Sequence, residues 1–257
     1  MQRRARREVG LAEVLDRLPE QPKKRGRIPF TRADLANDAE LAEFDTLEAI
    51  AAGDTLITGA VFTGTLEGVA WEVQVDVLVR NPDGSYMPVM VSNHRVARPD
   101  PHKTMQGIAV TRLGLGQPLE LKATLRHHTI DGYRLTLALM GLEEAGAAPE
   151  SSIGAVVGQD RDWAYLVDVT RYAPAAHRAL LTPAPTAPRR VKECATCRFW
   201  PKCEPELKAA DDISLFLTGD RADTYREKGI NTTTALIDAN LGEISHVAAA
   251  WRAETPV

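Results

Sequence analysis

Two strongly apolar segments flank a short turn-forming stretch and constrain the fold more than any other feature of the chain. WEVQVDVLVR (71–80) and YMPVMVSNHRV (86–96) are rich in β-branched and aromatic residues, and NPDGS (81–85) lies between them. Such runs around an Asp-Gly turn are typical of an antiparallel hairpin. GTLEGVAW (64–71) predicts a further tight hairpin just before it. The sequence therefore predicts a sheet with residues 71–96 at its core.

Helical patterns surround this predicted sheet. Apolar residues of 1–18 fall near one helical face, and residues 31–53 predict helices that begin near Thr31 and Asp34 and end at Gly53. Further along, the patterns predict weak helical character at 106–118, a buried helix over 123–146, a strand–turn–strand over 151–169, a helix through His177 and a helical tail. The expected fold class is α/β, with a central mixed β-sheet flanked by helices.

Composition limits the cellular setting. The chain has 257 residues, 44% of them apolar, and a formal net charge of −4, which suits one large or two small soluble domains. No apolar run reaches the roughly 18–20 residues of a spanning helix, and the basic start MQRRARREVG lacks the apolar region of a secretory signal. We therefore expect a cytoplasmic protein without a membrane partner.

The three cysteines of the chain, Cys194, Cys197 and Cys203, lie within ten residues of one another. Three interpretations remain open. They are buried free thiols, ligands of a structural zinc ion, or ligands of an iron–sulfur cluster. Zinc needs a fourth ligand, and the nearest histidines, His177 and His246, are distant in sequence. An odd number of cysteines argues against a disulfide framework.

On these cysteines the chain resembles the RecB-like nucleases of the PD-(D/E)XK superfamily, in the branch that carries a [4Fe–4S] cluster, which includes CRISPR-associated and AddB-type nucleases. The resemblance covers most of the chain. It implies a restriction-endonuclease-like core and a cluster held by three C-terminal cysteines and one N-terminal cysteine in a Cys-x-Arg-Arg element. Here Met1 stands in place of that cysteine, before Arg3 and Arg4. We expect a native N-terminus that is longer, which the genomic sequence upstream would test.

The resemblance also implies an active site. The family holds Mg²⁺ or Mn²⁺ with an Asp on one strand and an acid on the next, and a Lys two residues after that acid polarises the attacking water. Asp76 matches the Asp, but Ser92, Asn93 and His94 stand at the second motif. Arg134 stands where the family has a supporting Gln. The implied catalytic residues are thus Asp76, Ser92, His94 and Arg134, with a dismantled metal site.

Other side chains are candidates to replace the missing metal ligands. Residues i and i+4 of a strand share a face, so Glu72 is expected beside Asp76 as a second metal ligand, with Asp131 nearby on a helix. His94, His127 and His128 instead favour a transition metal. Asp211 and Asp212 are candidates for the missing cluster ligand.

DNA is the expected partner, as single strands or duplex ends. Residues 211–240 resemble a helix–hairpin–helix segment, whose backbone N–H groups contact phosphates. Three basic groups are candidate phosphate contacts: Arg3, Arg4, Arg6 and Arg7; Lys23, Lys24, Arg25 and Arg27; and Arg189, Arg190 and Lys192.

The predicted organisation is a nuclease-fold core at 1–190 followed by a cysteine segment and helical tail at 191–257. The first functional hypothesis is a metal-dependent DNA nuclease of repair or recombination, with a helicase or another repair protein as a further partner. The second is a module of the same fold that binds DNA or protein without cleaving. The third is a zinc-stapled interaction module.

Overall fold

The computed structural model describes residues 2–20, 30–36, 41–126, 128–184 and 186–253, with side chains from residue 6 onwards. The chain divides into two compact units, Met1–Thr182 and Pro183–Val257, and each is described by itself. Met1, His127 and the basic group Lys23, Lys24, Arg25 and Arg27 lie outside the described residues, as do the side chains of Arg3 and Arg4.

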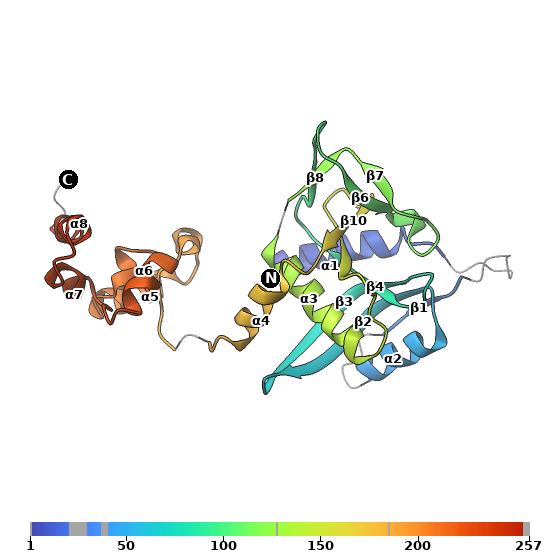
Figure 1. The fold of residues 1–257 in the computed structure, drawn as a ribbon, viewed down its shortest axis with the longest axis horizontal. Helices are drawn as coiled ribbons and strands as arrows, with labels where there is room; N and C mark the ends of the chain where they lie inside the picture. The colour runs from blue at the N-terminus through green and yellow to red at the C-terminus, as the bar shows by residue number, and fades with distance from the viewer. Residues whose placement is uncertain (1, 21–29, 37–40, 127, 185, 254–257) are drawn as a thin grey trace. The chain divides into compact units, whose positions relative to one another are not determined.

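The first unit is built on a large mixed sheet, shown in Figure 1. Its strand order is β1-β2-β3-β4-β9-β10-β6-β7. The pairs β1–β2 and β4–β9 are parallel, and the other neighbours are antiparallel. The strands are β1 (Arg32–Asp34), β2 (Leu56–Leu66), β3 (Val69–Arg80), β4 (Tyr86–Val91), β6 (Met105–Ala109), β7 (Leu119–Leu121), β9 (Ile153–Val157) and β10 (Trp163–Asp168). A separate small ladder joins β5 (Ala97–Pro99) to β8 (Ala123–Leu125). The predicted α/β class with a mixed central sheet is confirmed.

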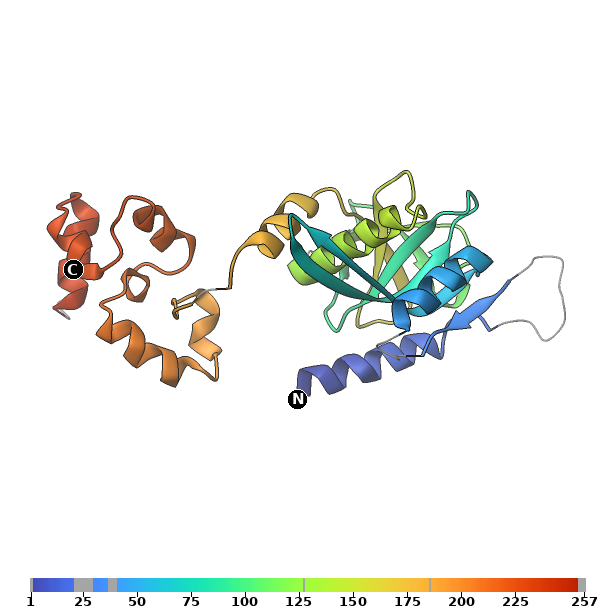
Figure 2. The ribbon, with the colours of Figure 1, turned by 90° about the horizontal axis from the view of Figure 1, so that it is seen from below.

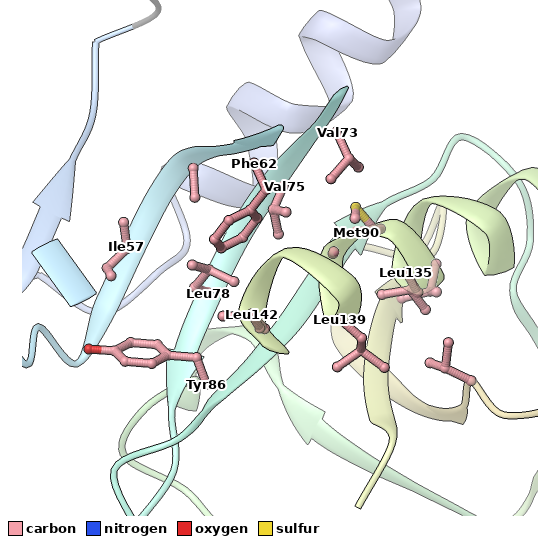
Figure 3. Close-up of a cluster of buried hydrophobic side chains, with 14 of the residues drawn as sticks. Ile57, Phe62, Val73, Val75, Leu78, Tyr86, Met90, Leu135, Leu139 and Leu142 are labelled. Carbon is pink, nitrogen blue, oxygen red and sulfur yellow. The ribbon is translucent and has the colours of Figure 1, made fainter. Parts of the chain in front are cut away.

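Helices cover both faces of this sheet (Figure 2). On one face lie α2 (Ala42–Ala52) and α3 (Thr129–Glu144), and α4 (Ala173–Leu181) packs against α3. On the other lies α1 (Gln2–Leu15), whose Val14 is buried against β3 and β4. Figure 3 shows the core under α3, where Leu135, Leu139 and Leu142 meet Phe62 and Met90 of the sheet. A Cβ at Gly141 would lie 2.4 Å from the Phe62 side chain, so only glycine lets α3 approach β2 this closely.

The predicted hairpins are present. β3 and β4 pair with Val77 opposite Val89, and the connecting turn places Gly84 at φ 90°. β2 and β3 join through Glu67 and Gly68, both at positive φ. The strand–turn–strand over 151–169 is confirmed as β9 and β10.

The segment 31–53 differs from the expected run of helices. It starts with the strand β1, which pairs in parallel with β2, and only then forms α2. Thr31 and Thr55 exchange backbone N–H to side-chain oxygen bonds, and Asp34 accepts a 2.7 Å bond from the Thr58 hydroxyl instead of capping a helix. Long-range pairing therefore prevails over the local capping pattern. The expected end at Gly53 is confirmed, with φ 74°.

Two further helical predictions were partly wrong for the same reason. Residues 105–109 form β6, followed by a short 3₁₀ turn, η1 (Val110–Arg112), because β6 completes a ladder with β10. Residues 123–125 form β8, paired with β5, so the helix predicted over 123–146 begins only at Thr129. Each of these short strands is stabilised by a partner that is distant in sequence.

Along β3, the side of the sheet toward which alternate side chains point changes midway. Val73 and Val75 of β3 belong to the core under α3, whereas Val77 and Val79 belong to the core on the opposite face. Strict alternation would keep all four on one face. The change falls at Asp76, and the residue that lies opposite in register, Gly59 of β2, has φ 72° and leaves the ladder. Asp76 is therefore at a break in the regular sheet.

The second unit is helical, as the sequence predicts. Its elements are η2 (Lys192–Thr196), α5 (Trp200–Ala209), η3 (Ile213–Leu215), α6 (Asp220–Arg226), α7 (Thr233–Asp238) and α8 (Glu243–Arg252). Ile213, Leu217, Ala222, Leu236 and Ala248 form its small core. In neither unit do the described residues contain a helix with the length and apolar character needed to cross a bilayer.

Candidate functional site at Asp76

The carboxylate of Asp76 is fully buried and held by cations. Its side chain has 0% exposure, and Arg7 of α1 donates to Oδ1 at 3.0 Å. Oδ2 accepts from Arg134 of α3 at 3.3 Å and from the Val91 backbone N–H at 2.7 Å. Two guanidinium groups from opposite faces of the sheet thus meet at the break in β3. Both carboxylate oxygens are engaged within the protein.

Arg134 has a structural place beside Asp76. It also donates to the backbone oxygen of Gln74 at 2.9 Å, and its side chain is 18% exposed. Burial lowers the pKa of Arg134, and the charge of Asp76 opposes that change. A guanidinium group remains protonated at neutral pH, so Arg134 is a permanent counter-ion of Asp76.

Ser92, Asn93 and His94 do not lie on a strand, because β4 ends at Val91. They form a bend in which the His94 backbone N–H faces the Ser92 hydroxyl at 3.3 Å. The strand alternation that would set two catalytic side chains on one face is therefore lost here. The strand assignment for 92–94 was wrong. The Ser92 N–H still bonds the Val157 oxygen of β9, but the Ser92 oxygen accepts from Arg161 and the backbone then bends.

Arg161 holds this bend in place. Its guanidinium group donates to the backbone oxygens of Ser92 and Gly158 at 2.7 and 2.8 Å, to Asn93 Oδ1 at 3.0 Å and to Glu13 of α1 at 3.2 Å. The residue is buried, with 9% exposure. Arg7 and Arg161 were not predicted as parts of the site, because Asp76 lies 69 residues from Arg7 and Ser92 lies 69 residues from Arg161 along the chain.

These residues line a pocket with a volume of about 860 Å³, here called the Asp76 pocket. Its lining comprises Arg6, Arg7, Val9, Gly10, Glu13, Val91, Ser92, Asn93, His94, Ile130, Asp131, Arg134, Gln159 and Arg161. Ser92, His94 and Arg134 therefore line one pocket, and Arg134 contacts the buried Asp76. The pocket also contains arginines that the family pattern does not include.

The proposed compensating ligands are not gathered at Asp76. Glu72 is exposed and lies beyond the change of face, so the spacing of four residues no longer sets it beside Asp76. Asp131 lines the pocket but makes no contact with Asp76 in the described part of the chain. His128 stacks on His94, with ring centroids 4.2 Å apart. Across the described residues no group of three or more His, Cys, Asp or Glu side chains is placed to hold a metal ion.

The residues around Asp76 fit a divalent cation poorly. Mg²⁺ and Mn²⁺ prefer several oxygen ligands, whereas the neighbours that contact Asp76 are two guanidinium groups and a backbone N–H. A cation at either oxygen would have to displace an arginine and then lie beside it.

A second depression adjoins this pocket and was not foreseen from the sequence. We call it the Trp163 groove; its volume is about 520 Å³ and Gln159 lines both it and the Asp76 pocket. Its lining comprises Arg95, Val96, Ala97, Arg98, Pro99, Leu121, Lys122, Ala123, Gln159, Asp160, Trp163 and Tyr165. Arg95, Arg98 and Lys122 are exposed and form no ion pair with any residue that the structure describes. The three cations come from segments that no local motif connects.

The cysteines lie in the second unit, on η2 and at the start of α5. All three are free thiols; Cys197 is exposed, and Cys194 and Cys203 are half-buried. The Val191 backbone N–H points at Cys194 Sγ at 3.3 Å. Of the suggested further ligands, Asp211 pairs with Arg252, and Asp212 with Arg226. These acids are therefore already engaged in ion pairs.

The third predicted basic group is also partly engaged. Arg189 pairs with Asp223 at 2.9 Å. Arg190 donates to the Leu215 backbone oxygen and lies over the Trp200 ring. Within this group Lys192 is exposed.

Comparison with known proteins adds no identity to this site. No family model, no curated protein and no solved structure matches the chain.

Proposed function

We propose that this chain is a DNA-binding protein of RecB-like nuclease type, with a restriction-endonuclease-like core, that acts in repair or recombination without cleaving DNA. The observation that carries the proposal is the engagement of both Asp76 oxygens by Arg7, Arg134 and the Val91 N–H. In a metal-dependent nuclease the corresponding carboxylate must be free to bind the cation. Here guanidinium groups hold the position that a metal ion would take.

The Trp163 groove supports DNA as the partner. Arg95, Arg98 and Lys122 line the same groove as Trp163, and Gln159 lines both this groove and the Asp76 pocket. Cations near an aromatic ring suit single-stranded nucleic acid, because phosphates bind the charges while a base stacks on the ring. The net charge of −4 makes such a local cluster the main source of attraction.

A binding and cleavage assay tests this function. We expect labelled single-stranded DNA to bind in EDTA and to remain uncut in Mg²⁺ or Mn²⁺. Each phosphate neutralised on a single strand contributes roughly −0.7 to the log–log salt slope, so three cations contribute roughly −2. The triple variant Arg95→Gln/Arg98→Gln/Lys122→Gln should lose that contribution.

The matched control removes the same charge elsewhere. Arg80, Arg112 and Arg178 are exposed and have no ion pair among the described residues. The triple variant Arg80→Gln/Arg112→Gln/Arg178→Gln should retain the wild-type slope. Equal salt slopes in the two triple variants would contradict the proposal that the Trp163 groove binds DNA. Cleavage in Mg²⁺ or Mn²⁺ that is abolished by Asp76→Ala would contradict the proposal and identify an active metal-dependent nuclease.

We also propose that Cys194, Cys197 and Cys203 hold a [4Fe–4S] cluster, with zinc as the alternative. Thiolates are the usual ligands of such clusters, and N–H contacts to sulfur tune them; the Val191 N–H makes such a contact to Cys194. When bound, the cluster would cross-link η2 and α5. Asp211 and Asp212 are less suitable as a fourth ligand, because each already has an arginine partner.

Metal analysis after anaerobic purification tests the cluster. Iron and acid-labile sulfide should copurify with the wild-type protein, and most of both should be lost in Cys197→Ser. Ala195→Ser is the matched control, because Ala195 is an exposed neighbour on η2. Zinc in place of iron would select the zinc alternative. Iron content unchanged by Cys197→Ser would contradict both.

A further inference from the structure

The Asp76 pocket contains hydrogen-bond donors that its ion pairs leave unused. A guanidinium group has five N–H donors, and Arg7 reaches Asp76 through Nη2 alone. Arg7 Nε is shielded from solvent and has no hydrogen-bond partner. Arg6 lines the same pocket, is exposed and has no ion pair with a described residue. The charged donors that the pocket offers to an incoming acceptor are therefore those of the exposed Arg6 and of the exposed part of the Arg7 side chain, which is 40% exposed.

The charge of the pocket favours an anion. Its cations are Arg6, Arg7, Arg134 and Arg161, and its acids are Glu13, Asp131 and the buried Asp76. Four positive and three negative side chains leave one net positive charge. Arg161 and Glu13 pair with each other, so the excess lies on the side of Arg6 and Arg7.

Asp131 indicates a second property of the ligand, a hydrogen-bond donor. It has 6% exposure and lines the pocket, and its Oδ2 is buried without a hydrogen-bond partner. A buried acceptor without a partner costs about 1–3 kcal/mol, so a ligand that supplies a donor gains from this contact. The rim of the pocket is apolar, since Val9 and Ile130 are each 60% exposed there. The ligand thus combines an anionic group, a hydrogen-bond donor and an apolar surface.

We propose that the Asp76 pocket binds a phosphate monoester of a nucleotide directly through Arg6 and Arg7, without a metal ion. The sugar or base then lies against Val9 and Ile130 and supplies the donor for Asp131. Arginine suits this role because its planar donors match phosphate oxygens in pairs. A volume of about 860 Å³ lies in the range of small-molecule sites. This inference rests on one part of the proposed function, namely that no metal ion binds at Asp76.

The phosphate can belong to a strand end or to a free nucleotide, and one titration series separates these sources. Binding is measured in EDTA for one oligonucleotide with hydroxyl ends, with a 5′-phosphate and with a 3′-phosphate. Deoxyadenosine 5′-monophosphate and deoxyadenosine are measured alongside. We expect a terminal phosphate to tighten binding about tenfold, as one charge-assisted contact worth about 1.4 kcal/mol would.

Arg6→Gln provides the matched loss, because the side chain is exposed and its replacement leaves Asp76 paired. In this variant the preference for phosphate should fall to about threefold or less, whereas Arg80→Gln should keep it. Equal binding of phosphate and hydroxyl ends would overturn the inference and leave DNA binding intact. A preference that requires Mg²⁺ would also overturn it. Binding of the mononucleotide without any oligonucleotide would support the pocket and overturn the proposed function instead.

Discussion

Replacing Asp76 with alanine is expected to lower the free energy of unfolding by about 3–5 kcal/mol, the usual effect of removing one partner from a buried ion pair. Arg134, 18% exposed, would lose its counter-ion, and the Val91 N–H would lose its acceptor. Urea unfolding of the full chain measures the change. Hydrogen exchange at the Val91 amide should accelerate in parallel, because that N–H would lose its protection.

Glu72→Ala is the matched control for this experiment. It removes the same charge from the same strand, but Glu72 is exposed, and such surface changes usually stay within about 0.5 kcal/mol. An Asp76→Ala protein as stable as the wild type would contradict the structural role. Loss of metal-dependent cleavage in that stable variant would instead identify Asp76 as a metal ligand.

Replacing Arg161 with methionine is expected to cost about 2–4 kcal/mol. The substitution keeps much of the apolar stem but leaves the backbone oxygen of Ser92 without its donor, and an unsatisfied buried group costs about 1–3 kcal/mol. The Gly158 oxygen also loses its side-chain donor, but it keeps the bond from the backbone N–H of residue 161. It also frees Asn93 and Glu13, so α1 and the bend at 92–94 lose their common anchor. Urea unfolding measures the loss.

Arg112→Met is the control for Arg161, since Arg112 is exposed and unpaired among the described residues. It should leave stability within about 0.5 kcal/mol of the wild type. If the two variants unfold at the same urea concentration, Arg161 is not the anchor that its contacts indicate.

The central strands were predictable because their patterns are local and strong. The turn at 81–85 and the hairpin at Glu67 and Gly68 carry residues that such turns require. The short strands β1, β6 and β8 were not predictable in this way. Each has three to five residues and is held by a partner far along the chain, so its own sequence carries little information.

The sequence could name several candidate residues of the site, but not the contacts that hold them. The resemblance implied Asp76, Ser92, His94 and Arg134 as site residues; the last three line one pocket, and Arg134 contacts Asp76. The counter-ions were not predictable, because nothing in the sequence near Arg7 or Arg161 specifies their partners. The break at Asp76 was also hidden, since it depends on Gly59 of the neighbouring strand. Strand alternation by itself therefore gave the wrong face for Glu72.

The paired state of Asp76 limits the order in which a metal site could be gained at this position. A glutamate introduced at residue 92 would enter a pocket that already contains Arg6 and Arg7, and would bind a guanidinium group rather than recruit a cation. Removing those arginines first would leave Asp76 buried and less neutralised, at a cost in stability. A metal site at this position would therefore require more than one substitution, and the first of them would lower the stability of the protein.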